Sequence, residues 1–136
     1  MPGRPDSLDR EARDLLTSAG QDLETAEVLS NDEGRPPRHA CMMAHLAAEK
    51  ALKAALVARG IDYPFTHDLD QLREELPESD QARISTEDLG SLAGWSIKGR
   101  YGALANEPTR DVAQDAVRAA KTVLGSAATI VTGGAV

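Results

Sequence analysis

Cysteine and aromatic residues are scarce in this chain of 136 residues. Its single cysteine, Cys41, excludes an internal disulfide and favours a reducing compartment. Aromatic residues make up 3% of the chain, whereas hydrophobic residues make up 41%. Alanine and leucine supply much of that hydrophobic content, and both are good helix formers. The composition therefore predicts a helical protein, in which Cys41 is a small buried hydrophobic residue without the partners of a nucleophile.

Long apolar runs are also missing. No stretch approaches the roughly 20 apolar residues that a membrane-spanning helix needs, and the first residues contain no apolar run typical of a secretion signal. We therefore expect no membrane association and a cytoplasmic location. No linker is long enough to divide the chain, so residues 1–136 are expected to form a single domain.

The net charge of -7 argues against a general nucleic-acid coat protein. The charge is unevenly distributed, because residues 34–60 contain five basic residues and one acidic residue, which gives +4 locally. Residues 93–136 are also mildly positive, with five basic and three acidic residues. A phosphate-bearing ligand could bind where two such basic segments meet. The alternative is that these are solvated helix faces that balance acidic neighbours.

Apolar residues recur at three- and four-residue steps along much of the chain, which is typical of amphipathic helices. The alanine-rich second helix is expected to lie at the centre of a bundle or in a dimer interface, and to end at Gly60. Thr66 is a candidate N-cap for the third helix, and Ser85 for the fourth. The pattern predicts an all-α, up-and-down bundle of about five helices, over residues 7–30, 38–59, 67–76, 86–101 and 109–131, with 132–136 as a disordered tail.

One polar stripe follows the second helix, where His45, Glu49 and Lys53 are spaced four residues apart. The stripe either makes ordinary helical side-chain pairs or faces a ligand or partner. His45 and Glu49 have the spacing of metal ligands on a helix, but no third ligand is evident unless His67 lies nearby in space. We therefore expect neither a metal nor another cofactor. The segment Thr66-His67-Asp68-Leu69 is similarly ambiguous, since a histidine in this position serves either structure or a site.

Taken together, these segments resemble a known family. The helix-two sequence Ala47-Ala48-Glu49-Lys50-Ala51-Leu52-Lys53-Ala54 is followed by Tyr63-Pro64, by Thr66-His67-Asp68-Leu69 and later by Gly99-Arg100-Tyr101. This combination resembles the HEPN domain (higher eukaryotes and prokaryotes nucleotide-binding) over nearly the whole chain. The resemblance implies a helical bundle that pairs as a homodimer, often beside a small nucleotidyltransferase in a toxin–antitoxin pair.

The resemblance further implies a metal-independent endoribonuclease motif, arginine followed by histidine after four to six residues, assembled across the dimer. Arg100 occupies the arginine position, but the candidate histidine positions hold Ala105, Asn106 and Glu107. Arg38 and His45 fit the spacing by count, although both lie in the second helix rather than where the family places the motif. The motif is therefore incomplete after Arg100, and the sequence leaves open whether the protein is an enzyme.

The leading hypothesis is a HEPN-type protein that binds a nucleotide or RNA and works with a small nucleotidyltransferase. No catalytic residue is assigned. The two alternatives are a non-catalytic helical dimerisation module and a divergent metal-independent endoribonuclease that uses a residue such as His67. The candidate ligand-binding residues are Arg100, Tyr101, Lys53, His67, Glu49 and His45.

Overall fold

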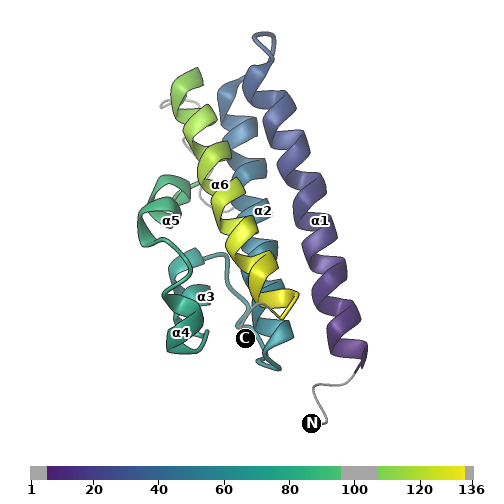
Figure 1. Cartoon of the computed structure of the whole chain (residues 1–136). Coiled ribbons are helices and arrows are strands. Elements are labelled where there is room, and N and C mark those ends of the chain that lie inside the picture. The colour runs from purple at the N-terminus through teal and green to yellow at the C-terminus, as the bar shows by residue number, and fades with distance from the viewer. Residues whose placement is uncertain (1–5, 96–106, 134–136) are drawn as a thin grey trace.

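The computed structural model describes residues 6–95 and 107–133, and every regular element within them is a helix. Three long helices, α1 (Asp6–Asn31), α2 (Pro37–Ala58) and α6 (Arg110–Val131), run side by side (Figure 1). Three short helices, α3 (Leu69–Glu74), α4 (Glu78–Gln81) and α5 (Thr86–Leu92), pack beside them. The predicted all-α fold class is confirmed. The described residues contain six helices, one more than expected.

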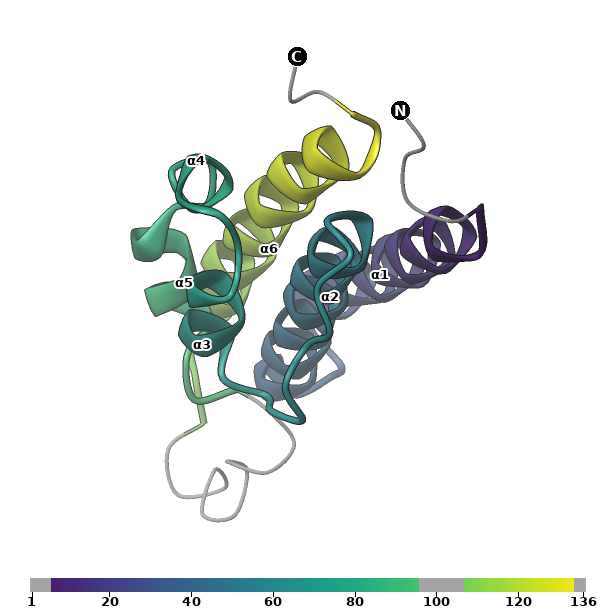
Figure 2. The ribbon, with the colours of Figure 1, turned by 90° about the horizontal axis from the view of Figure 1, so that it is seen from below.

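Helix α2 is the centre of the bundle. It contacts α1 and α6 along their lengths and also reaches α3 and α5, and the end-on view places it between α1 and the short helices (Figure 2). Fourteen of its 22 residues are buried, and eight of these are alanines. Such small side chains allow neighbouring helices to approach closely. The predicted central position of this helix is therefore confirmed.

The buried thiol of Cys41 lies on this central helix and has no exposed surface. Burial, with a further contribution from the charge of Glu107, raises the pKa of Cys41 to about 11. Because the thiolate is the reactive form of cysteine, this residue is inert at neutral pH. It packs as the small hydrophobic residue that the sequence predicted.

The ends of α2 follow from its sequence. Pro37 occupies the first turn, where its missing N–H has no partner to lose. At the other end, Gly60 adopts a φ of +72° and donates its N–H to the Val57 carbonyl at 2.9 Å. The Ile61 N–H reaches the Leu56 carbonyl at 2.9 Å, which completes a Schellman motif. The expected stop at Gly60 is confirmed.

The short-helix region differs most from expectation. Asp68, and not Thr66, is the N-cap of α3, and its carboxylate accepts the N–H groups of Asp70 and Gln71. Ser85 caps α5 as predicted. Helix α5 was expected to continue past Ala93, but it ends at Leu92 because Gly94 takes a φ of +88°. The predicted continuation beyond residue 95, and most of the predicted tail, lie outside the described residues.

No helix among the described residues is long and apolar enough to cross a membrane.

Candidate functional site

A cleft of about 610 Å³ opens between α2 and the short helices. Its lining comes from the segment 65–70, from His45 of α2, and from Leu89, Ala93 and Gly94 around the end of α5. The wall thus combines an exposed loop with one member, His45, of the polar stripe predicted on α2. It is the place in the described structure where the two candidate histidine segments meet.

Glu49 is the hub of this site. Its side chain is 6% exposed, yet its carboxylate accepts hydrogen bonds from two other residues. The Lys53 Nζ atom lies 2.9 Å from Oε2, and the His67 Nδ1 atom lies 3.0 and 3.1 Å from the two carboxylate oxygens. A buried carboxylate is costly unless it is paired in this way. Glu49 therefore ties the loop that carries His67 to the central helix.

The loop geometry that presents His67 is set by its own side chains. The Asp68 N–H donates to the Thr66 hydroxyl at 3.0 Å, so the backbone turns directly at His67. Asp68 then caps α3 and fixes the direction in which the chain continues. These local bonds hold the imidazole against Glu49 and leave its side chain 51% exposed.

His45 lies beneath this contact, with its Nδ1 atom 3.8 Å from the Glu49 carboxylate. Burial lowers the pKa of His45 below its ordinary value, although the charge of Glu49 opposes the shift. His45 is therefore neutral at pH 7. Lys53 and His67, and not His45, are the partners that hydrogen-bond the Glu49 carboxylate.

The pairing of Glu49 with His67 has a chemical consequence. A carboxylate that accepts the Nδ1–H of an imidazole fixes its tautomer and orientation, and leaves Nε2 to face a ligand. Since half of the His67 side chain is exposed at the cleft, its ring can hydrogen-bond a ligand or transfer a proton. Among the described residues, this is the arrangement best suited to polar chemistry.

Lys53 contributes to the same cluster in a different way. Its Nζ atom pairs with Glu49 and lies 5.1 Å from the centre of the Tyr63 ring. Both contacts direct the ammonium group toward Glu49 and Tyr63. Lys53 therefore supports Glu49, and it does not line the cleft.

Four of the six candidate ligand-binding residues thus lie together, namely His45, Glu49, Lys53 and His67. Arg100 and Tyr101 lie outside the described residues. The sequence did not single out Phe65 or Asp70, which also line the cleft. Both flank the Thr66-His67-Asp68 segment in the chain, so proximity to that motif was the available signal.

The alternative pair, Arg38 and His45, does not form a site. Seven residues apart on one helix, the two lie roughly 10 Å apart along its axis. The guanidinium group of Arg38 pairs with Glu107, while His45 is buried beside Glu49. The match to the family spacing is therefore one of sequence count alone.

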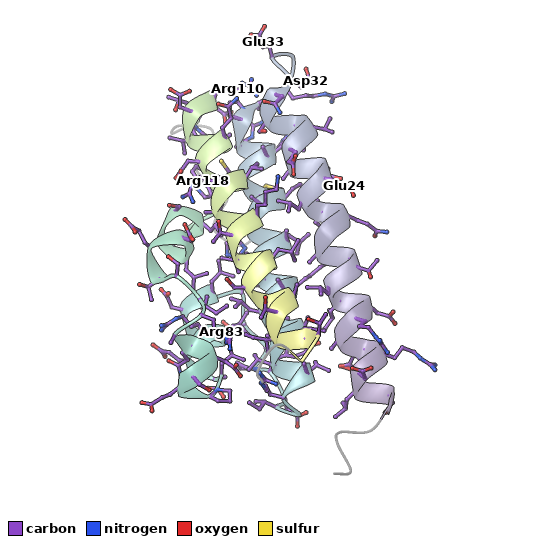
Figure 3. The ribbon with its side chains drawn as sticks, in the orientation of Figure 1. Glu24, Asp32, Glu33, Arg83, Arg110 and Arg118 are labelled. Carbon is purple, nitrogen blue, oxygen red and sulfur yellow. The ribbon has the colours of Figure 1, made fainter. Side chains whose placement is uncertain are left out.

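Glu107, one of the positions where a motif histidine was sought, has a structural role. It accepts the backbone N–H of Arg38 at 3.0 Å as well as pairing with its guanidinium group, so it closes the first turn of α2. Nearby, Arg110 donates to the carbonyls of Leu29 and Ser30 at 3.2 Å and of Arg35 at 3.1 Å. Arg110 lies at the same end of the bundle as Asp32 and Glu33 (Figure 3). This segment fastens the start of α6 to the α1–α2 turn.

A second buried carboxylate, Asp80 of α4, pairs with Arg59 at the end of α2. The Arg59 Nε and Nη2 atoms lie 2.6 and 3.0 Å from the two carboxylate oxygens. The Arg59 hydrogen bond lowers the pKa of Asp80, and the same bond raises the pKa of Arg59. Arg59 and Asp80 lie 21 residues apart in the chain, so no local sequence pattern links them.

Within residues 6–95 and 107–133, no group of three or more histidine, cysteine, aspartate or glutamate side chains is arranged to hold a metal ion.

Comparison with known proteins places this geometry in context. The family model described as the HEPN domain matches residues 12–130. The crystal structure of TT1696 from Thermus thermophilus is similar, with a TM-score of 0.72 and 28% identity over 88% of this chain and 98% of that one. ST0689, described as an archaeal HEPN homologue, has a TM-score of 0.70 and 22% identity, covering 89% of this chain and 98% of its own. No curated protein matches the chain.

Proposed function

The chain belongs to the HEPN family, and we propose that it binds a nucleotide or RNA in the cleft beside His67. The observation that supports this proposal best is the contact between His67 and the buried Glu49, 3.0 Å apart. It positions an exposed imidazole at the edge of a cleft large enough for part of a nucleotide. From the sequence, we include Arg100 as a phosphate contact and Tyr101 as a packing or stacking residue.

The charges of the cleft define what a phosphate would require. Asp68 and Asp70 both line the cleft, and the charge of Lys53 is balanced by Glu49. An anionic ligand therefore needs further positive charge, which Arg100 would supply beside the His67 ring. Removing the Asp70 carboxylate should strengthen binding, because it removes a repulsion without removing a cap.

Titration of a short single-stranded RNA into the purified protein tests the proposal. Binding should weaken as salt is added, because phosphate contacts release counterions. Arg100→Ala and His67→Ala should each weaken binding about 10-fold or more, the effect of losing a charged hydrogen bond. Asp70→Asn should bind more tightly than the unchanged protein.

Two matched controls separate a local effect from a general loss of charge. Arg10→Ala removes an exposed arginine from α1, which packs on the other side of α2. His39→Ala removes a histidine from the first turn of α2. Both should bind RNA as the unchanged protein does. The proposed site would be rejected if the wild-type protein showed no salt-sensitive RNA binding. It would also be rejected if the two controls lost as much RNA affinity as Arg100→Ala and His67→Ala.

For partners and location, we propose a cytoplasmic homodimer that acts with a small nucleotidyltransferase as a toxin–antitoxin-like pair. The support is the family membership and the matching sequence segments. Light scattering of the purified protein measures the oligomeric state, and co-purification with the product of an adjacent nucleotidyltransferase gene tests the partner. A stable oligomer without affinity for any nucleotide or RNA would instead favour the non-catalytic dimerisation module.

Metal-independent RNA cleavage is a second candidate function, and the Glu49–His67 pair is the observation that favours it. A carboxylate-oriented imidazole is a suitable general base for removing the proton of a ribose 2′-hydroxyl. The 2′-oxygen would then attack the adjacent phosphorus, the P–O5′ bond would break, and the departing 5′-oxygen would take a proton from water. RNA incubated with the protein in chelator should then be cleaved, and His67→Ala should abolish cleavage while His39→Ala retains it. Glu49→Gln should slow the reaction without abolishing it. Intact RNA in the presence of the unchanged protein would exclude this activity.

A further inference from the structure

Phe65 is the only phenylalanine in the chain, and its side chain is fully exposed. A large apolar ring in this position gains nothing from the protein core. A single exposed hydrophobic residue is ordinary in itself, as Val28 on α1 illustrates. Phe65 differs because it also lines the cleft that contains His67.

The backbone around Phe65 is held by local hydrogen bonds. The Thr66 N–H donates to the Pro64 carbonyl at 2.9 Å, so Phe65 lies at the centre of a three-residue turn. Pro64 restricts its own backbone on one side, and the Thr66 hydroxyl accepts the Asp68 N–H on the other. The ring is thus presented on a fixed turn, and binding a ligand would require little ordering of this segment.

The positions of Phe65 and His67 fit two parts of one ligand. Only Thr66 separates the two residues in the chain, and both line the same cleft. His67 offers a polar ring at the cleft, held by Glu49, while Phe65 offers an aromatic face. A ligand with a phosphate or ribose group at one end and a planar ring at the other matches both.

We propose that Phe65 is a stacking platform for an unpaired nucleobase whose sugar-phosphate group lies beside His67. This inference rests on the proposed function and narrows its ligand to free nucleotides and single-stranded RNA. Bases in a duplex are already stacked and paired, so they cannot reach the ring without being extruded. Stacking of one base on an aromatic side chain strengthens binding by roughly 5- to 150-fold and tolerates any base.

Two ligands that differ only by the base provide the test. Adenosine monophosphate and ribose 5-phosphate are titrated into the full chain, into Phe65→Leu and into Phe65→Trp. The unchanged protein should bind the nucleotide at least about 5-fold more tightly than the sugar phosphate. Phe65→Leu should remove most of that preference without weakening ribose 5-phosphate binding, and Phe65→Trp should retain or increase it. Because the ring is fully exposed, all three proteins should have similar melting temperatures.

The outcomes separate this inference from the proposed function. If Phe65→Leu keeps the full preference for the nucleotide, the stacking role is rejected while the phosphate site stands. If Phe65→Leu instead converts a dimer into a monomer and leaves the preference unchanged, the ring is a subunit contact and the inference is overturned. If neither ligand nor RNA binds the unchanged protein, both proposals fail together.

Discussion

Glu49 and Asp80 both carry buried carboxylates, with side chains 6% and 4% exposed, but their partners differ. Asp80 is held by a guanidinium group through two hydrogen bonds of 2.6 and 3.0 Å. Glu49 is held by an ammonium group and by an imidazole whose side chain is half exposed at a cleft. Arginine keeps its proton at any ordinary pH, whereas histidine exchanges its proton near neutrality. The comparison separates an ion pair suited to structure from one suited to function.

Breaking the Asp80 pair should have the largest effect on stability. Asp80→Asn removes the charge that balances the guanidinium group of Arg59, and we expect a loss of about 3 kcal/mol in the free energy of unfolding. Urea denaturation measures this as a lower midpoint with an unchanged slope. RNA binding by the folded variant should be unaltered. A loss below about 1 kcal/mol would show that the pair contributes no more than an exposed one.

The acid limb of the stability curve provides a second test of the Asp80 pair. The folded state lowers the pKa of Asp80 below its ordinary value of 3.8. The resulting stabilisation is therefore present above about pH 4 and is lost as the pH falls through the folded-state pKa. The difference in unfolding free energy between the unchanged protein and Asp80→Asn should shrink between about pH 5 and about pH 2. A constant difference across that range would contradict the assignment.

Glu49→Gln should lower ligand affinity and have a smaller effect on stability than Asp80→Asn. An amide can still accept a hydrogen bond from His67, so the cost in unfolding free energy should be about 1–2 kcal/mol, chiefly from leaving Lys53 without its counterion. Ligand affinity should fall about 10-fold, because the hydrogen bond from His67 to a neutral amide is weaker than the one to a carboxylate and holds the ring less firmly at the cleft. The measurement is a paired one, comparing RNA affinity and urea midpoint for Glu49→Gln and Asp80→Asn. Equal effects of the two variants on affinity would abolish the distinction between the carboxylates.

The smallest expected effect concerns His45. Burial lowers the pKa of His45 in the folded state below its ordinary value of 6.5. As the pH falls, His45 therefore binds its proton at a higher pH in the unfolded chain than in the folded protein. The protein should therefore lose stability below about pH 6.5, with a contribution from His45 of at most about 1.4 kcal/mol per pH unit. His45→Gln should flatten the curve of unfolding free energy between about pH 7.5 and about pH 5.5. An unchanged slope would mean that His45 does not titrate on unfolding.

The long helices could be predicted from the sequence because each carries a sustained apolar period and recognisable end residues. Helix α4 could not, since the four residues Glu78–Gln81 contain no hydrophobic period. The end of α5 was missed because its extent depends on the backbone conformation of Gly94. These differences are confined to the short helices, where local propensity is weak and packing decides.

The candidate site was predictable only in part. The spacing of His45, Glu49 and Lys53 indicated one stripe, and a histidine in the following loop suggested a site. The meeting of His67 with Glu49 depends on how the loop returns across α2, which no local pattern specifies. The same limit applies to Arg59 and Asp80, and to Glu107, whose partner Arg38 lies 69 residues earlier in the chain.

The most direct test of the central claim is a backbone amide NMR titration with adenosine monophosphate. We predict that the largest chemical-shift changes fall on residues 65–70 and on Ala93 and Gly94, which line the cleft, and that His67→Ala greatly reduces them. The amides along α1, on the other side of α2, should remain unchanged. Shifts concentrated on α1, or no shifts at millimolar nucleotide, would contradict a nucleotide site beside His67.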